Sequence, residues 1–159
     1  MTSTDISVKM VLDRWYGSIQ NLDKHLNELT DSQLQNEVAP GKNRGTYLLG
    51  HLIAVHDDML ILLNMGEKLF PELHEPYIKQ PDAKKDELLS VNQLKAMWKK
   101  QNEALQIKFS QLKTEDWFER HTAVSVADFA QEPHRNKLNI IITRTSHLQY
   151  HSGQIVLLK

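Results

Sequence analysis

Apolar side chains recur every three or four positions in four separate stretches of the chain, which is the spacing of helices with one buried face. The stretches cover residues 5–29, 46–65, 91–112 and 137–158. The first stretch shows the pattern in these residues: Val8, Val11, Trp15, Ile19, Leu22, Leu26 and Leu29. No segment shows an alternation that demands a strand, although residues 124–129 could pair briefly. The pattern therefore predicts an all-α fold.

Short polar residues and glycine suggest where the first two helices begin and end. Ser3 or Thr4 is expected to cap the first helix, and Thr46 follows a loop of Pro, Gly and polar residues as the cap of the second. Gly66 is expected to stop the second helix at residue 64 or 65.

Two long connections separate the later helices. Residues 67–90 contain Pro71, Pro76 and Pro81, and this segment is much longer than the usual connection of about 4–6 residues. Two neighbouring helices that run the same way need such a crossover, so the expected architecture is a four-helix bundle with long crossover connections. A second connection starts with a capped turn at residues 114–117 and passes Pro133. The length of 159 residues suits a single domain, residues 1–159.

Composition and charge narrow the function classes. Nineteen Lys and Arg nearly balance twenty Asp and Glu without a long run of either sign, so no nucleic-acid partner is expected. The segment from residue 1 to 5 lacks the pattern of a secretion signal. The most apolar stretch, residues 47–65, is interrupted by two histidines and two aspartates, which argues against a membrane span. We therefore expect a cytoplasmic protein with no membrane partner.

The chain has no cysteine and eight histidines. The absence of cysteine excludes disulfides, Cys-ligated zinc and a cysteine nucleophile. Any thiol in the chemistry would have to be supplied by a small molecule. The histidine positions are therefore the informative feature.

His147 and His151 lie four residues apart in the last predicted helix, so both rings project from one face and could share a metal ion. Gln154 follows on the same stripe and could support a ligand or substrate. The alternative is that the pair is a coincidence in a His-rich chain. A metalloprotease would need Glu directly after the first His, where this chain has Leu148.

His51 lies on the inward stripe of the second helix and is the third candidate ligand. A lone inward His is more often a hydrogen-bonded core residue, but a catalytic zinc-type site needs three protein ligands and an open position. His56 is rotated by about 140° from His51, and Asp58 lies about 10 Å along the axis, so neither is expected in the site. The other four, His25, His74, His121 and His134, are expected to be solvated or locally hydrogen-bonded. No Glu-x-x-His motif occurs, which argues against a ferritin-like di-iron centre.

Two motifs resemble the DinB/YfiT-like superfamily of metal-dependent enzymes. One is Gly50-His51-Leu52, which opens the second helix, and the more specific one is the HxxxHxGQ string from His147 to Gln154. The helix that contains Trp98 and the stretch from residue 112 to 117 follow in the expected order, so the resemblance covers nearly the whole chain.

The resemblance implies a four-helix bundle, a homodimer, and one divalent metal ion, zinc or nickel, on His51, His147 and His151. Some members are transferases or isomerases that use a low-molecular-weight thiol such as bacillithiol or mycothiol. Members often carry a Trp-Ser pair before the first ligand, where this chain has Arg44-Gly45-Thr46. This departure leaves the shape of the pocket and the small-molecule substrate open.

A divalent ion on three neutral imidazoles would keep its double charge and an open position. Such an ion lowers the pKa of bound water to about 7 and deprotonates a bound thiol. The lack of an inward Glu weakens the case for a metal-dependent hydrolase. The leading hypothesis is therefore a transferase that uses a low-molecular-weight thiol. The alternatives are a stress-related, non-catalytic metal- or ligand-binding module and a hydrolase. No catalytic residue is assigned, and Gln154 is the candidate support of the ligands.

Overall fold

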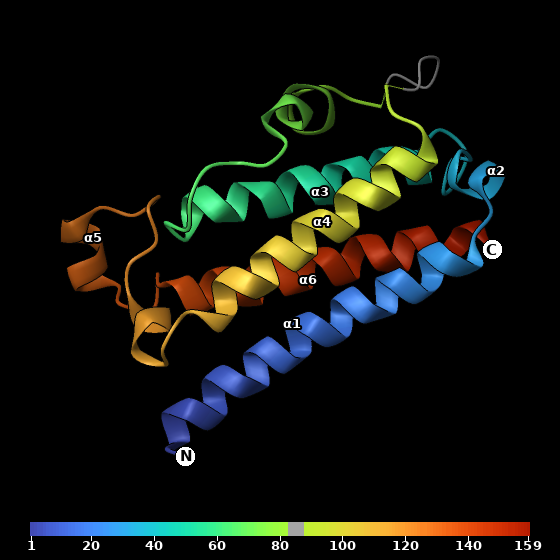
Figure 1. The fold of residues 1–159 in the computed structure, drawn as a ribbon. Helices are drawn as coiled ribbons and strands as arrows, with labels where there is room; N and C mark the ends of the chain where they lie inside the picture. Colours follow the sequence, from blue (N-terminus) through green and yellow to red (C-terminus); the bar gives the residue numbers. More distant parts are fainter. Residues whose placement is uncertain (83–87) are drawn as a thin grey trace.

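The computed structural model describes residues 1–82 and 88–159, and four long helices form its body. They are α1 (Ser3–Glu28), α3 (Gly45–Leu62), α4 (Val91–Ser110) and α6 (Lys137–Ile155). Figure 1 shows that α3 and α4 run in the same direction, whereas α1 and α6 run in the opposite one. The predicted four-helix bundle with a long crossover between parallel neighbours is therefore confirmed. Within the described residues no helix is both long and apolar enough to cross a membrane.

Shorter helices fill the connections. They are α2 (Asp31–Leu34), the 3-10 helix η1 (Pro71–Leu73), the π-helix η2 (Glu75–Lys79), the 3-10 helix η3 (Glu115–Phe118), α5 (Val126–Gln131) and the 3-10 helix η4 (Val156–Leu158). The crossover was expected to be loop, but Pro71 and Pro76 each stand at the start of a short helical turn, where a missing N–H costs nothing. Residues 124–129 form no strand, because Ser125 caps α5 by accepting from the Asp128 amide.

Helix ends differ from the sequence expectation where tertiary contacts supply the hydrogen bonds. The first helix is capped by Thr2 in a reciprocal capping box with Asp5, and not by Ser3 or Thr4. The expected cap Thr46 lies inside α3 and is buried, because the helix starts at Gly45, whose amide donates to the Asn36 carbonyl at 3.1 Å. These starts were therefore predicted one to two residues too late.

The end of α3 is a left-handed turn at Asn64, with φ of 57°. The Met65 amide donates to the Leu60 carbonyl at 2.8 Å, as in a Schellman motif. Gly66, with φ of 124°, follows this turn and does not make it.

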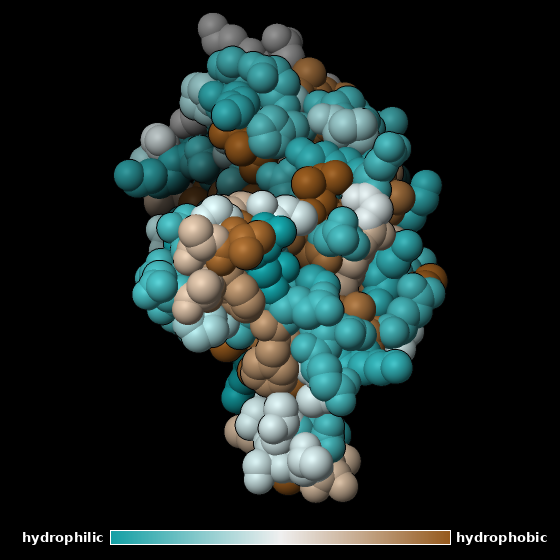
Figure 2. Space-filling view, turned by 90° about the vertical axis from the view of Figure 1, so that its left-hand side faces the viewer, coloured by the Kyte–Doolittle hydropathy of each residue, from teal (hydrophilic) through white to brown (hydrophobic). Residues whose placement is uncertain are grey.

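The core lies where the four long helices face one another and contains all three tryptophans, Trp15, Trp98 and Trp117. The end of the bundle that carries α5 and the N-terminus is mostly hydrophilic, with apolar side chains in small separate areas (Figure 2). In the described part of the chain, α1 packs against α6, while α3 packs against α4, α6, η1 and η2. The pairing of α3 with α6 and with the crossover helices is what builds the site.

Candidate metal centre

Three histidines meet where α3 packs against α6. The Nε2 atom of His147 lies 3.2 Å from Nε2 of His51 and 3.1 Å from Nε2 of His151. One ligand nitrogen from each ring lies within 4.8 Å of the others, and all three side chains are half-buried. The fold thus brings together the three histidines that the sequence singled out.

The hydrogen bonds of the outer ring nitrogens fix where two of the protons lie. His51 Nδ1 is 2.8 Å from the Tyr77 backbone carbonyl, and His151 Nδ1 is 2.7 Å from Gln154 Oε1. Because an oxygen of this kind can only accept, each Nδ1 carries the proton and each neutral ring keeps its lone pair on Nε2. Both lone pairs face His147 Nε2, which could donate a proton to only one of them. Hydrogen bonding alone therefore does not satisfy the three rings together.

The donor set fits a divalent metal ion. Two nitrogens that each bind an ion at about 2.05 Å and lie 3.1–3.2 Å apart subtend about 100° at the ion, between octahedral and tetrahedral angles. Neutral imidazole is a ligand for zinc, nickel, iron and copper. Within residues 1–82 and 88–159 no carboxylate joins the group. The three-His group could hold a metal ion with three nitrogen ligands.

The surroundings keep these rings neutral. Burial, together with the neighbouring His151, His51 and Arg144, lowers the pKa of His147 to about 4. Burial also lowers the pKa of His151, against the opposite effect of its hydrogen bond to Gln154. Neutral imidazole is the form that binds metal, so at pH 7 these two rings are ready to act as ligands.

A glycine allows the crossover to reach His51. A Cβ atom added to Gly50 would lie 2.3 Å from Tyr77 Cε1, which no real contact permits. The ring of Tyr77 therefore packs directly on the backbone of α3, and its own carbonyl comes into hydrogen-bond range of His51. The Gly-His pair thus has a physical role, because glycine makes room for the residue whose carbonyl orients the His51 ring.

His56 is separate from the three-His group and belongs to the core. It is fully buried between the rings of Trp15 and Trp98, at centroid distances of 4.8 and 5.0 Å. Its Nδ1 lies 3.0 Å from Asn102 Oδ1. Burial lowers its pKa to about 3, so the ring stays neutral. The interpretation of His56 as a residue outside the site agrees with this geometry.

Two histidines in the connections between the long helices, His121 and His74, have different surroundings. His121 was expected to be solvated or locally hydrogen-bonded; it is buried, and its Nδ1 accepts a local hydrogen bond from the Ala123 amide at 3.2 Å. His74 lies 3.7 Å from Asp58, which also pairs with Lys68 at the edge of α3. This polar group lies two helical turns along α3 from His51.

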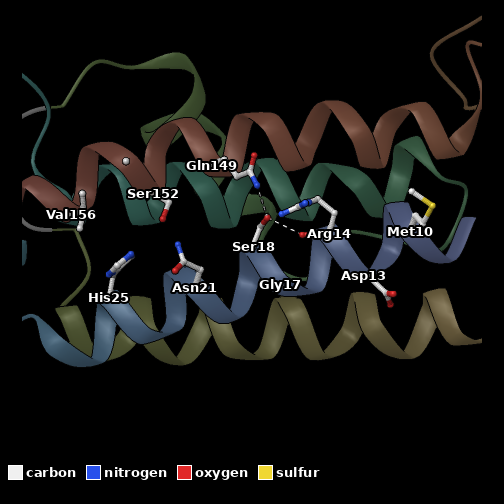
Figure 3. A pocket seen from close by; sticks show the side chains of 11 residues that line it. Met10, Asp13, Arg14, Gly17, Ser18, Asn21, His25, Gln149, Ser152 and Val156 are labelled. Atoms are coloured by element: carbon white, nitrogen blue, oxygen red, sulfur yellow. Dashed lines mark hydrogen bonds between the residues drawn. The ribbon is translucent and has the colours of Figure 1, made fainter. Parts of the chain in front are cut away.

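A wide groove lies on the other side of α6. It has a volume of about 690 Å³ and is bordered by α1 and α6 (Figure 3). Gln149 and Ser18 form a 3.1 Å hydrogen bond across it. Gln149 is two residues after His147, which places it about 200° around the helix from that ligand. The groove therefore does not open on the three-His group.

The fold and the site define a class of four-helix bundle proteins with a candidate metal centre between two antiparallel helices. The sequence profile of the DinB superfamily matches residues 14–155, a range that contains all three histidines, and the chain belongs to this superfamily. No curated protein matches the chain. The fold is similar to the crystal structure of a conserved protein from Enterococcus faecalis, with a TM-score of 0.63 and 16% identity over 99% of this chain and 95% of that one.

Proposed function

We propose that His51, His147 and His151 bind one divalent metal ion, zinc or nickel, and that the protein is a transferase that activates a low-molecular-weight thiol there. The observation that carries the proposal is the fixed direction of the lone pairs: two Nδ1 protons are held by carbonyl oxygens, so that both Nε2 lone pairs face the third ring. Membership of the DinB superfamily is compatible with a metal-dependent enzyme.

The protein fixes the orientation of the candidate ligand rings and supplies them as neutral imidazoles. The Tyr77 carbonyl and the Gln154 side chain hold the Nδ1 protons of two ligands, which fixes the orientation of both rings. Three neutral imidazoles leave the double charge of the ion uncompensated. The ion, when bound, supplies a Lewis acid that lowers the pKa of a thiol or a water in its open position.

The lack of a base near the ligands favours a thiol over water as the nucleophile. In the part of the chain that the structure describes, no carboxylate belongs to the histidine group. Hydrolysis usually needs a residue that moves protons, whereas a thiol that has lost its proton needs no further base. Tyr150 is 65% exposed, so it is poorly placed to act as an acid. Because the chain has no cysteine, the sulfur must come from a cosubstrate.

The proposed reaction is a substitution or addition at an electrophilic carbon. The thiol sulfur forms a bond to this carbon and the thiol proton goes to solvent. In a substitution the leaving group departs with its electron pair, and in an addition the electron pair of the broken π bond takes up a proton from solvent. To test this, protein purified without a His-tag and loaded with zinc or nickel is incubated with bacillithiol, mycothiol or glutathione and 1-chloro-2,4-dinitrobenzene. Product formation is expected to require the ion and to be lost in His147→Ala. Absence of turnover with every thiol would contradict the transferase proposal.

Metal analysis of the same sample separates the alternatives. About one ion per chain without any thiol transfer would favour the non-catalytic binding module. In that case chelation should change only stability. Turnover of ester or amide substrates without a thiol would favour the hydrolase. A metal content far below one ion per chain, even after loading, would leave the three histidines as core residues.

A further inference from the structure

Among the residues that the structure describes, Arg144 has no counter-ion, and it lies next to the three-His group. It lies on α6 three residues before His147, and residues with this spacing are neighbours on a helix surface, with Cβ atoms about 5–6 Å apart. Its Nε atom is buried and has no hydrogen-bond partner, and among the described residues Arg144 forms no ion pair. A guanidinium has five donors and loses solvation when it is buried, so this arrangement is unfavourable in the protein alone.

The carboxylate that acts on Arg144, that of Asp58, already pairs with another side chain. Burial lowers the pKa of Arg144 and outweighs the opposite effect of Asp58 on α3, which is the one carboxylate among the described residues that raises this pKa. Asp58 instead pairs with Lys68 and lies 3.7 Å from His74. The pairing of Asp58 with Lys68 therefore leaves the charge of Arg144 without a carboxylate partner among the described residues.

The position of Arg144 on α6 places its unpaired charge near the three-His group. Arg144 lies one turn before His147 on α6, and its Nε atom is buried in the bundle. The crossover helices η1 and η2 pack on α3 on the side of Asp58 and His51. A small molecule at the three-His group would thus meet the guanidinium one helical turn away on α6.

We propose that Arg144 binds a carboxylate of the substrate pair while the sulfur or the electrophilic carbon reacts at the three-His group. This inference rests on the proposed function and names the substrate class: at least one of the two reactants is a carboxylic acid. Guanidinium and carboxylate match each other as planar, bidentate partners, and the acceptor would satisfy the donors that the protein leaves unpaired. The carboxylate belongs either to the thiol or to the electrophile, and the two sources can be distinguished.

Two pairs of probes isolate the carboxylate. N-acetylcysteine and N-acetylcysteamine are thiols that differ only by a carboxylate, and 4-chloro-3,5-dinitrobenzoate and 2-chloro-1,3-dinitrobenzene are electrophiles that differ in the same way. The variants are Arg144→Gln, which keeps a polar side chain without the charge, and Arg144→Lys, which keeps the charge without the planar fork. Lys99→Gln removes one charge from an exposed position of α4 as the matched control.

Binding is measured first on the metal-free protein, by following the Nε–H nuclear magnetic resonance signal that Arg144→Gln removes. The carboxylate member of at least one pair is expected to shift this signal and to bind about 10–100-fold more tightly than its neutral partner. Arg144→Gln should abolish the difference, Arg144→Lys should reduce it, and Lys99→Gln should keep it. A thiol-dependent difference assigns the carboxylate to the thiol, and an electrophile-dependent one assigns it to the electrophile.

The stability of Arg144→Met is a second test. If Arg144 served only to stabilise the fold, this substitution would lower the midpoint of urea unfolding. Because the buried Nε has no partner, Arg144→Met should raise the midpoint of urea unfolding of the metal-free protein. A lower midpoint in Arg144→Met, or equal binding of both members of each pair, would overturn the assignment. If the carboxylate preference is found but no thiol transfer occurs, the proposed function fails and the Arg144 site remains.

Discussion

Replacing Gly50 by alanine tests how the crossover supports the site. The new methyl carbon would lie 2.3 Å from Tyr77 Cε1, and ordinary contact begins at 3.4 Å, so the ring must move by roughly 1 Å. Tyr77 is buried, and a forced shift of a core ring costs about 3 kcal/mol at the upper end of the usual range. Alanine recovers about 1 kcal/mol of helix propensity, which leaves a net loss of about 2 kcal/mol.

The movement of Tyr77 has a second effect, on the ligand. Its carbonyl accepts from His51 at 2.8 Å, and a displacement of this size breaks the hydrogen bond. Loss of such a partner typically weakens metal binding about 10–100-fold. We therefore expect Gly50→Ala to melt about 4–8 °C below the wild type without metal and to bind zinc about 10–100-fold more weakly.

Thermal unfolding of the metal-free protein and competition with a chelating dye measure the two effects. Gly17→Ala is the matched control, because it adds a methyl group to α1 where no atom lies within 4 Å, so it should be neutral or slightly stabilising. The reasoning is refuted if Gly50→Ala melts and binds zinc as the control does.

Three further outcomes are expected. His147→Ala and His151→Ala should each abolish tight metal binding in dye competition, whereas His56→Ala should not; equal losses in all three variants would break the assignment. The free energy of unfolding, measured in urea, should fall as the pH drops below about 6.5. In the unfolded chain these histidines bind protons near this pH, whereas in the folded protein buried His56 and His147 stay neutral, because their pKa values are about 3 and 4. This pH slope should become shallower in His56→Leu, and an unchanged slope would assign the effect to other groups. Asp57→Ala should lower the free energy of unfolding by about 1–3 kcal/mol, since the Asp57 carboxylate accepts from two backbone amides at 2.7 and 2.8 Å; a loss below 0.5 kcal/mol, on the order of a surface substitution, would contradict this.

The four long helices and the crossover between parallel neighbours could be predicted from the sequence, because apolar periodicity reports which face of each helix is buried. Helix starts could not be predicted to the residue. Thr46 looks like a cap, yet the start of α3 is satisfied by a carbonyl of the preceding loop, at Asn36, and the threonine is buried instead. Single-domain organisation, a cytoplasmic location and a homodimer stay predictions.

For the site, the spacing of His147 and His151 and the inward position of His51 were sufficient to name the three histidines. The supporting group at His51 could not be predicted, because it is a backbone carbonyl, which has no sequence signature. Arg144 was visible three residues before His147, but its lack of a counter-ion depends on Asp58 being paired with Lys68. The sequence therefore names the candidate ligands, while the fold is needed to see what surrounds them.

His51 and His147 are 96 residues apart in the chain, and the backbone carbonyl of Tyr77, in a third segment, holds the His51 ring in place. An ion bound here would act as a cross-link between α3 and α6, and the energy of binding would add directly to the stability of the native bundle. Local opening of either helix would disrupt the ligand set. Slow amide hydrogen exchange in both helices should therefore become slower together when metal is added.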